Sequence, residues 1–308
     1  MLNEAITSRK TKQPFPNLFI LGAPKCGTTS MAAWLAEHPN VFMSDPKELM
    51  FFNTDFGHSR GLTFDEYCDI FAAAGPQHTV IGEASTHYLA SAEAVPNILA
   101  CVPDARFIVM LRRPQDMAVS LHAELCHTVE TEPDFEKAWN LQEQRRAADA
   151  GDRTPGLKDL LQYGRTCSVG RQLERVVDFA KRPHLHIVFL ENIQRDACSE
   201  YDRVLQFLQL PDFRPASFVA HNRRVALRSL LLGHAANLLR KLKTRAGMTR
   251  ATGLLAPLHR LNRKHAPVTP IRVEMQQRLA ACFAPDIAKV REIVRSIPAE
   301  WIDSNPRQ

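Results

Sequence analysis

A lysine, two glycines and three hydroxyl residues lie close together in the run Gly22-Ala23-Pro24-Lys25-Cys26-Gly27-Thr28-Thr29-Ser30. Residues of these types bind oxyanions, because an ammonium group brings a full positive charge and hydroxyl and backbone N–H groups donate hydrogen bonds. An apolar run, Leu18 to Leu21, precedes this stretch and a helical pattern follows it. The stretch is therefore expected to join a buried strand to a helix N-terminus, where unpaired N–H groups and the helix dipole favour an anion.

The order of residues in this loop differs from that of the usual ATP-binding loop. The pattern G-x-x-x-x-G-K-[ST] places the lysine next to the hydroxyl residue, whereas Lys25 lies two positions before Gly27 and Thr28 takes the lysine position. The order P-K-x-G-T-T/S resembles the phosphosulfate loop of sulfotransferases that use 3′-phosphoadenosine 5′-phosphosulfate (PAPS). From the loop alone, an ordinary nucleotide loop and a strand-loop-helix unit that binds nothing remain open.

The resemblance implies roles for the whole loop. Lys25 is expected to act in catalysis by stabilising charge on the leaving phosphate oxygen. The donor's 5′-phosphosulfate is expected to be bound by Lys25, Cys26, Gly27, Thr28, Thr29 and Ser30.

A second chemical cluster pairs Lys47 and Glu48 with the aromatic residues Phe51 and Phe52. A K-E pair shortly before F-F, at about this interval from the loop, resembles carbohydrate-type sulfotransferases. In that family the glutamate takes the acceptor's proton. The resemblance implies that Glu48 is the general base and that Lys47 lies near the transferring group. The residues by themselves also fit a solvated ion pair ahead of two core phenylalanines.

A third segment begins with the apolar run Arg106 to Leu111, which predicts a strand, and continues with Arg112 and, eight positions later, Ser120. The pattern R-x-P-x(5)-S resembles the site at which the family binds the donor's 3′-phosphate, so Arg112 and Ser120 are expected to bind that group. Arg113 is expected to be a solvated surface charge.

A fourth segment, from Gly82 to Tyr88, resembles the family pattern G-E-x-S/T-P-x-Y. Glu83 is expected near the acceptor or to orient the site. His87 could face the acceptor, although a structural histidine fits this position better. Two positions depart from the pattern. Ala84 replaces the lysine of some heparan-type members, and Thr86 replaces the frequent proline.

The resemblance extends over roughly residues 17 to 301 and is to the carbohydrate- or heparan-type sulfotransferase domain in a soluble, bacterial-like form. Alternating strand and helix patterns predict an α/β fold, P-loop-like, with a mainly parallel central sheet and helices on both faces. Catalytic loops are then expected at the strand ends. The domain prediction is a flexible leader at 1–16, a single domain at 17–308, a basic lid at 221–273 and C-terminal helices at 274–303.

The elements that should position these residues can be placed by apolar runs and helical spacing. Strands are expected at Leu18–Leu21, Val41–Met43, Thr79–Glu83, Arg106–Leu111 and Leu185–Leu190. Helices are expected at Phe64–Ala74, Ser91–Ala100, Gln115–Leu125, Phe135–Ala150 and Ser168–Phe179, and from about Cys198.

Composition limits the class of protein. The chain has 308 residues, 45% hydrophobic and 23% charged, as in an ordinary globular protein. The segment Met1 to Pro16 lacks an apolar signal core, and seven scattered cysteines form no C-x-x-C pair. These features argue against a disulfide framework or a structural zinc site. A cytoplasmic location, either free or peripheral at a membrane, and a reaction without metal are expected.

Positive charge is concentrated near the C-terminus. Twelve of the 39 Lys and Arg residues, and no Asp or Glu, lie between His221 and Val273, which leaves 27 basic against 33 acidic residues elsewhere. Within it, leucines from Leu227 to Leu242 predict a basic amphipathic helix, either a lid packed on the core or a helix on an anionic membrane surface. The absence of a recognition motif argues against nucleic acid.

Taken with the resemblance, the residues predict transfer of a sulfuryl group from PAPS to a hydroxyl or amine of a carbohydrate, glycolipid or small-molecule acceptor. Two alternatives remain open at this point. One is a P-loop kinase or NTPase that uses ATP and magnesium. The other is a non-catalytic nucleotide- or membrane-binding protein on the same scaffold.

Overall fold

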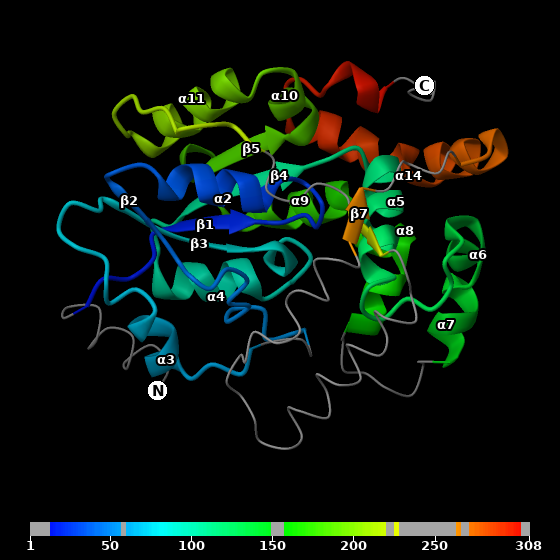
Figure 1. Cartoon of the computed structure of the whole chain (residues 1–308), viewed down its shortest axis with the longest axis horizontal. Helices are drawn as coiled ribbons and strands as arrows, with labels where there is room; N and C mark the ends of the chain where they lie inside the picture. The colour runs from blue at the N-terminus through cyan, green and yellow to red at the C-terminus, as the bar shows by residue number, and fades with distance from the viewer. Residues whose placement is uncertain are drawn as a thin grey trace.

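The centre of the molecule is a five-stranded parallel sheet in the order β2-β3-β1-β4-β5 (Figure 1). The structure is a computed structural model that describes residues 13–56, 60–148, 157–219, 225–227, 263–265 and 271–302. All four residues of β1 are fully buried, as expected for a parallel strand with helices on both sides. The strands are β1 (Leu18–Leu21), β2 (Val41–Met43), β3 (Val80–Ser85), β4 (Arg106–Leu111) and β5 (Leu185–Phe189).

Helices cover both faces of this sheet, as predicted. The chain moves from β1 through α2 (Thr28–Ala36) toward one edge, and from β3 through α4 (Ala94–Cys101) toward the other. Right-handed crossovers in opposite directions place the two helices on opposite faces, and Figure 1 shows this arrangement. Helix α9 (Val169–Phe179) packs beside α4. Helix α11 (Ala197–Leu208) joins α2 through the Tyr201 hydroxyl, which donates to the Trp34 carbonyl at 3.3 Å.

The long C-terminal helix α14 (Val273–Ile293) packs on α9 and α5. The Asp286 carboxylate of α14 accepts the backbone N–H groups of Gly170 at 2.7 Å and Arg171 at 3.0 Å, so one helix caps the start of the other. The remaining elements are α3 (Phe64–Asp69), η1 (Thr86–Tyr88), α5 (Pro114–Leu125), α6 (Phe135–Asn140), α7 (Gln142–Ala148), η2 (Leu157–Leu161), α8 (Tyr163–Thr166), η3 (Arg182–His184), α10 (Leu190–Arg195) and η4 (Ala299–Trp301).

Several predicted helix bounds are wrong at their ends. The helix that begins at Phe64 ends at Asp69, although Phe71 beyond it is fully buried. The apolar residues beyond Asp69 are thus spaced for burial in the core, although this segment is not an α-helix. The region predicted as one helix over Phe135–Ala150 consists of α6 and α7, which separate at Leu141. Helix α4 begins at Ala94, three residues after the predicted start.

The described end of the predicted leader is packed on the domain. The ring of Phe15 lies 6.1 Å from that of Phe64 and 5.9 Å from that of Tyr67, centroid to centroid. The sheet domain therefore begins before residue 17, and residues 1–12 lie outside the described part.

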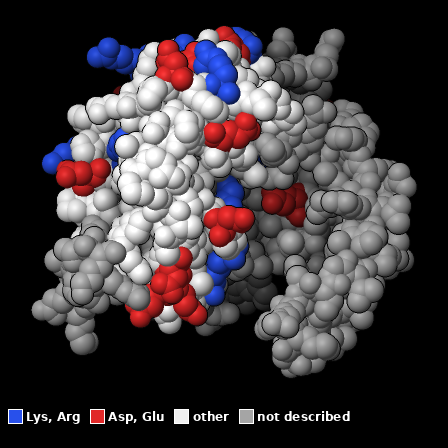
Figure 2. Space-filling view, turned by 60° about the vertical axis from the view of Figure 1, so that its left-hand side comes forward, with Lys and Arg blue, Asp and Glu red and all other residues white. Residues whose placement is uncertain are grey.

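Most of the predicted lid, 221–273, also lies outside the described residues. Leu227 is in a strand, β6 (Val225–Leu227), paired antiparallel with β7 (Arg263–His265), so the predicted helix is wrong at that residue. Elsewhere on the described surface that Figure 2 displays, acidic and basic side chains are interspersed. Among the described residues, no helix has the combined length and apolar character needed to cross a bilayer.

Candidate active site

The five parallel strands have their carboxyl ends on the same side of the sheet, and each is followed by a loop or helix that carries a chemically distinctive residue. Lys25 follows β1, Glu48 follows β2, Thr86 follows β3, Arg112 follows β4 and Glu191 follows β5. The chain continues from β1 toward one edge of the sheet and from β3 across β1 toward the other. This reversal is where open α/β sheets bind their ligands.

The loop after β1 is fixed by its neighbours on both sides. The Ala23 N–H donates to the Met110 carbonyl at 2.7 Å, and the Met110 N–H donates to the Gly22 carbonyl at 3.1 Å. A Cβ atom on Gly22 would lie 1.9 Å from the Thr86 carbonyl oxygen, so no other residue fits. Gly27 precedes α2 at a φ of 88°, in the left-handed region that favours glycine. Because Gly27 has no side chain, a ligand can approach the N-terminus of α2 closely.

Within this loop, Lys25 and Cys26 have different surroundings. The Lys25 ammonium lies 2.9 Å from a carboxylate oxygen of Glu124, in the last turn of α5. The Cys26 thiol is fully buried, and burial raises its pKa far more than Arg112 and Lys25 lower it. A helix N-terminus beside a lysine therefore gives no reactive thiolate here, and Cys26 can serve an anion only through its backbone.

The Glu48 carboxylate is oriented by groups from two other segments. One oxygen accepts the Thr86 backbone N–H at 2.8 Å and the Thr86 hydroxyl at 3.1 Å. The other accepts the Lys47 ammonium at 2.5 Å. The same ammonium donates to the Thr28 hydroxyl at 3.2 Å, at the first residue of α2. Lys47 thus joins the predicted base to the predicted phosphosulfate loop, which the sequence could not show.

Hydrogen bonds hold the backbone of the Glu48 segment next to the end of β3. The Glu48 N–H donates to the Ala84 carbonyl at 3.0 Å. From the other side, the Arg60 guanidinium donates to the carbonyls of Glu48 at 2.7 Å and Lys47 at 2.8 Å. Sequence reasoning missed Arg60 and the positioning role of Thr86. Thr86 directly follows β3, but the predicted strand ended at Glu83, so this position was not evident from the sequence.

Glu83 lies in β3 and is fully buried. Burial raises its pKa to about 8, opposed by the hydroxyls of Tyr88 and Tyr67 and reinforced by the negative charge of Glu48. Near neutral pH this carboxyl is mainly protonated. Full burial also separates it from an acceptor in this conformation, in contrast to the side chain of Glu48, which is 26% exposed.

The predicted 3′-phosphate residues both belong to the β4–α5 unit. Arg112 donates to the Lys25 carbonyl at 3.3 Å and so lies beside the loop after β1. The Ser120 side chain in α5 is 2% exposed, and its hydroxyl has no hydrogen-bond partner among the described residues. Such a buried hydroxyl suits a ligand oxygen.

Arg113 corrects a prediction, because it is buried and not a solvated surface charge. Its backbone N–H donates to a carboxylate oxygen of Glu191 at 2.8 Å. Glu191, also buried, ties the start of α5 to the end of β5. Its position directly after a strand was a usable sequence signal.

His87, predicted near the acceptor, is 9% exposed and lies on η1 with its ring 5.8 Å from that of Phe56. It therefore lies next to the Thr86 that holds Glu48.

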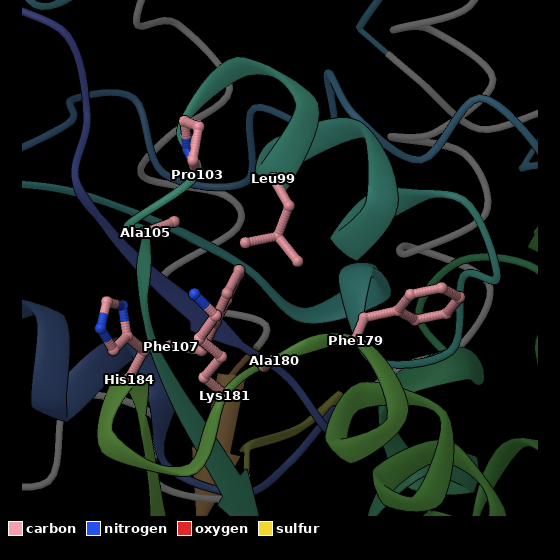
Figure 3. A pocket seen from close by; sticks show the side chains of 8 residues that line it. All are labelled: Leu99, Pro103, Ala105, Phe107, Phe179, Ala180, Lys181 and His184. Carbon is pink, nitrogen blue, oxygen red and sulfur yellow. The ribbon is translucent and has the colours of Figure 1, made fainter.

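A described cavity of about 230 Å³ lies at the opposite end of the strands (Figure 3). Its lining includes Ala105, directly before β4, and His184, directly before β5. The lining also includes Leu99, Phe179 and Lys181, and it is mainly apolar. This cavity is separate from the strand-end loops and holds none of the predicted site residues.

Comparison with known proteins assigns the family. Residues 15–228 match the family model described as the sulfotransferase domain. The chain belongs to the sulfotransferase family. The match contains every predicted site residue, and it favours sulfuryl transfer over ATP-dependent phosphoryl transfer and over binding without turnover. The described residues contain no group of three His, Cys, Asp or Glu placed to hold a metal ion, and metal-free chemistry stays a prediction.

Two curated relatives are similar to parts of this chain. Human bifunctional heparan sulfate N-deacetylase/N-sulfotransferase 3 is 28% identical over 212 residues, which are 66% of this chain and 23% of that protein. Membrane-associated sulfotransferase kil1 of Dictyostelium discoideum is 26% identical over 108 residues, 34% of this chain and 22% of that protein. The alignments thus span less than a quarter of these relatives.

A solved sulfotransferase from Alicyclobacillus acidocaldarius has the same fold. Its TM-score is 0.69 at 22% identity, over 94% of this chain and 100% of that chain. This likeness confirms the predicted fold class.

Proposed function

We propose that this chain transfers a sulfuryl group from PAPS to an acceptor hydroxyl or amine. The observation that carries the proposal is the position of the Lys47 ammonium, which contacts both the Glu48 carboxylate and the Thr28 hydroxyl. This contact supports a proton acceptor next to an oxyanion-binding loop. Sulfuryl transfer needs these two groups together, because the acceptor must lose a proton while negative charge develops on the leaving oxygen.

The residues around the loop fit the donor's two anionic ends. The helix N-terminus at Gly27, the hydroxyls of residues 28–30 and the Lys25 ammonium suit the 5′-phosphosulfate. The Ser120 hydroxyl, buried and without a protein partner among the described residues, and the Arg112 guanidinium suit the 3′-phosphate. When bound, the donor supplies the activated sulfuryl group and a phosphate leaving group.

Each side chain then has a distinct task. Glu48 takes the acceptor's proton, with its orientation set by Thr86. Lys25 neutralises charge on the leaving phosphate oxygen, and Lys47 faces the transferring group. Glu83, protonated in the core near neutral pH, adds no second negative charge next to Glu48. We assign it a positioning role in place of acceptor contact.

For the acceptor we propose a carbohydrate or glycoconjugate hydroxyl or amine, on the K-E…F-F pattern and the heparan-type relatives. Ala84 stands where some heparan-type members carry lysine. The acceptor is therefore expected to be less acidic than heparan near that residue. Glycolipids and small molecules are the other acceptor classes to test.

Thermal stabilisation by nucleotides tests the donor assignment. A ligand that binds only the folded state raises the melting temperature, and the rise grows with the logarithm of ligand concentration divided by Kd. We expect 3′,5′-adenosine bisphosphate to stabilise the protein far more than 5′-AMP, because Arg112 and Ser120 contact the extra phosphate. If ATP with magnesium stabilised the protein and the bisphosphate did not, the proposal would be contradicted.

The variant Arg112→Ala sharpens this experiment. It should lose most of its affinity for the bisphosphate and keep its affinity for AMP. Arg195→Ala, which removes an exposed arginine that pairs with Glu300, is the matched control and should bind both nucleotides as the wild type does. Equal losses for both nucleotides in Arg112→Ala would show that this arginine does not recognise the 3′-phosphate.

A further inference from the structure

The ion pair between Lys25 and Glu124 places a negative charge at the entrance of an anion site. The two side chains are 2.9 Å apart, nitrogen to oxygen, and are 18% and 52% exposed. Glu124 belongs to α5, four residues after Ser120. Residues four apart lie on the same helix face. The Ser120 hydroxyl and the Glu124 carboxylate are therefore on the face of α5 that is turned toward the loop after β1.

Nothing in α5 itself calls for a glutamate at this position. It lies in the last turn of the helix, where the helix dipole disfavours a carboxylate. The described ion pair of this carboxylate is with Lys25. The contact pairs Glu124 with the ammonium on which the proposed chemistry depends. We therefore expect this glutamate to change ligand binding at the site and not the stability of the helix.

We propose that Glu124 is a positioning residue that holds the Lys25 ammonium in the donor-free enzyme and competes with the donor for it. This inference rests on the proposed function. When the donor binds, the ammonium exchanges the Glu124 carboxylate for a donor oxygen. The pair must therefore be broken in every catalytic cycle, and its strength subtracts from the affinity for the donor.

The physical consequence is a weaker Michaelis complex with an unchanged chemical step. Breaking the pair affects the bound ground state and the transition state equally, so it changes KM for the donor and leaves kcat constant. A half-exposed ion pair is worth up to about 1 kcal/mol, which corresponds to roughly fivefold in affinity.

The test measures binding of 3′,5′-adenosine bisphosphate and steady-state transfer from PAPS in the variant Glu124→Gln. We expect about three- to fivefold tighter bisphosphate binding, a fall of the same size in KM for the donor, and kcat within twofold of wild type. Glu143→Gln removes the same charge from an exposed glutamate of α7 and should change none of these values.

A double-mutant comparison shows whether Glu124 acts through Lys25. In a Lys25→Ala background, Glu124→Gln should leave bisphosphate affinity unchanged, since the ammonium for which it competes is absent. Unchanged or weaker binding in the single variant Glu124→Gln, or an equal gain in both backgrounds, would overturn the inference and leave the proposed function intact. A wild-type protein that does not bind the bisphosphate would overturn both.

Discussion

Lys25 and Glu48 hold backbone conformations that residues with side chains rarely adopt. Their φ angles are 66° and 60°, and Met50, in the same segment as Glu48, has 50°. Of the four non-glycine residues at positive φ in the described ranges, three thus lie in the two loops that carry the proposed chemistry. Such conformations cost on the order of 1–3 kcal/mol each and persist where the surroundings impose them. For the Glu48 segment, the hydrogen bonds with Arg60 and Ala84 supply that constraint.

Replacing the loop lysine tests its role at the leaving oxygen. We expect Lys25→Ala to lower turnover by roughly a hundredfold or more, since a lost charge-assisted contact to a developing oxyanion costs about 3 kcal/mol. Circular dichroism and melting temperature should remain close to wild type. Lys289→Ala removes a surface lysine that pairs with Glu174 and should retain full turnover. Near-normal turnover in a folded Lys25→Ala protein would contradict the assignment.

The proposed base can be separated from its buried neighbour by two matched substitutions. Glu48→Gln keeps the shape of the side chain but cannot take a proton, so single-turnover transfer should fall by about 10²–10⁴ while bisphosphate affinity is retained. Glu83→Gln should retain the chemical step to a much greater extent, because Gln resembles the protonated acid that the core holds. Loss of the chemical step in Glu83→Gln alone would show that Glu48 is not the base.

Glu83 should also make stability depend on pH. The folded protein holds its proton up to a pKa of about 8, whereas the unfolded chain releases it near the ordinary value of 4.5. Between these values the folded state binds more protons, so the contribution of Glu83 to stability falls as pH rises. Denaturant unfolding should therefore show Glu83→Gln gaining stability relative to wild type from pH 4.5 to 8. A difference that is flat with pH would exclude the raised pKa.

At the scale of elements, the site depends on how closely the loop after β1 approaches η1. Gly22→Ala should destabilise the fold by about 2 kcal/mol or more and reduce donor binding, because its Cβ would meet the Thr86 carbonyl. Gly164→Ala is the control, since the nearest atom to its added Cβ lies at 3.6 Å. Free energies of unfolding compare the two variants. Equal stability would show that the loop can move away from η1 at little cost.

The sequence predicted the strands better than the contacts at their ends. Uninterrupted apolar runs identify β1 and β4 correctly, because buried parallel strands leave no polar face. The same burial hides the position of Glu83, since both faces of its strand are covered and alternation gives no signal. The bridge from Lys47 to Thr28 joins residues of different strand-loop units. It depends on strand order, which apolar runs do not encode.

At the scale of the whole molecule, the uneven charge predicts dependence on ionic strength. The segment from His221 to Val273 carries twelve basic residues without an acidic one, whereas the described surface in Figure 2 mixes both signs. Binding of the bisphosphate, an acidic acceptor or phosphatidylserine vesicles should weaken by about threefold or more between 0.05 M and 0.5 M salt, because screening shortens the reach of charge. Gln substitutions at Arg240, Lys241 and Lys243 should reduce that dependence. If none of these affinities changed with salt, the segment from His221 to Val273 would be solvated and would bind no anion.

The central place of β1 in the sheet has a consequence for biosynthesis. Leu18 pairs with Gly82 on one side and with Arg106 on the other, so β1, the first of the five described strands of this sheet to be synthesised, has both edges open until its partners are made. At about 5–20 residues per second, that delay is roughly 4–18 s. The loop after β1, which is hydrogen-bonded to Met110 of β4, reaches its final conformation only at the end of that delay. A nascent chain that stops short of β4 is thus expected to expose an apolar strand to chaperones and to have no affinity for nucleotide.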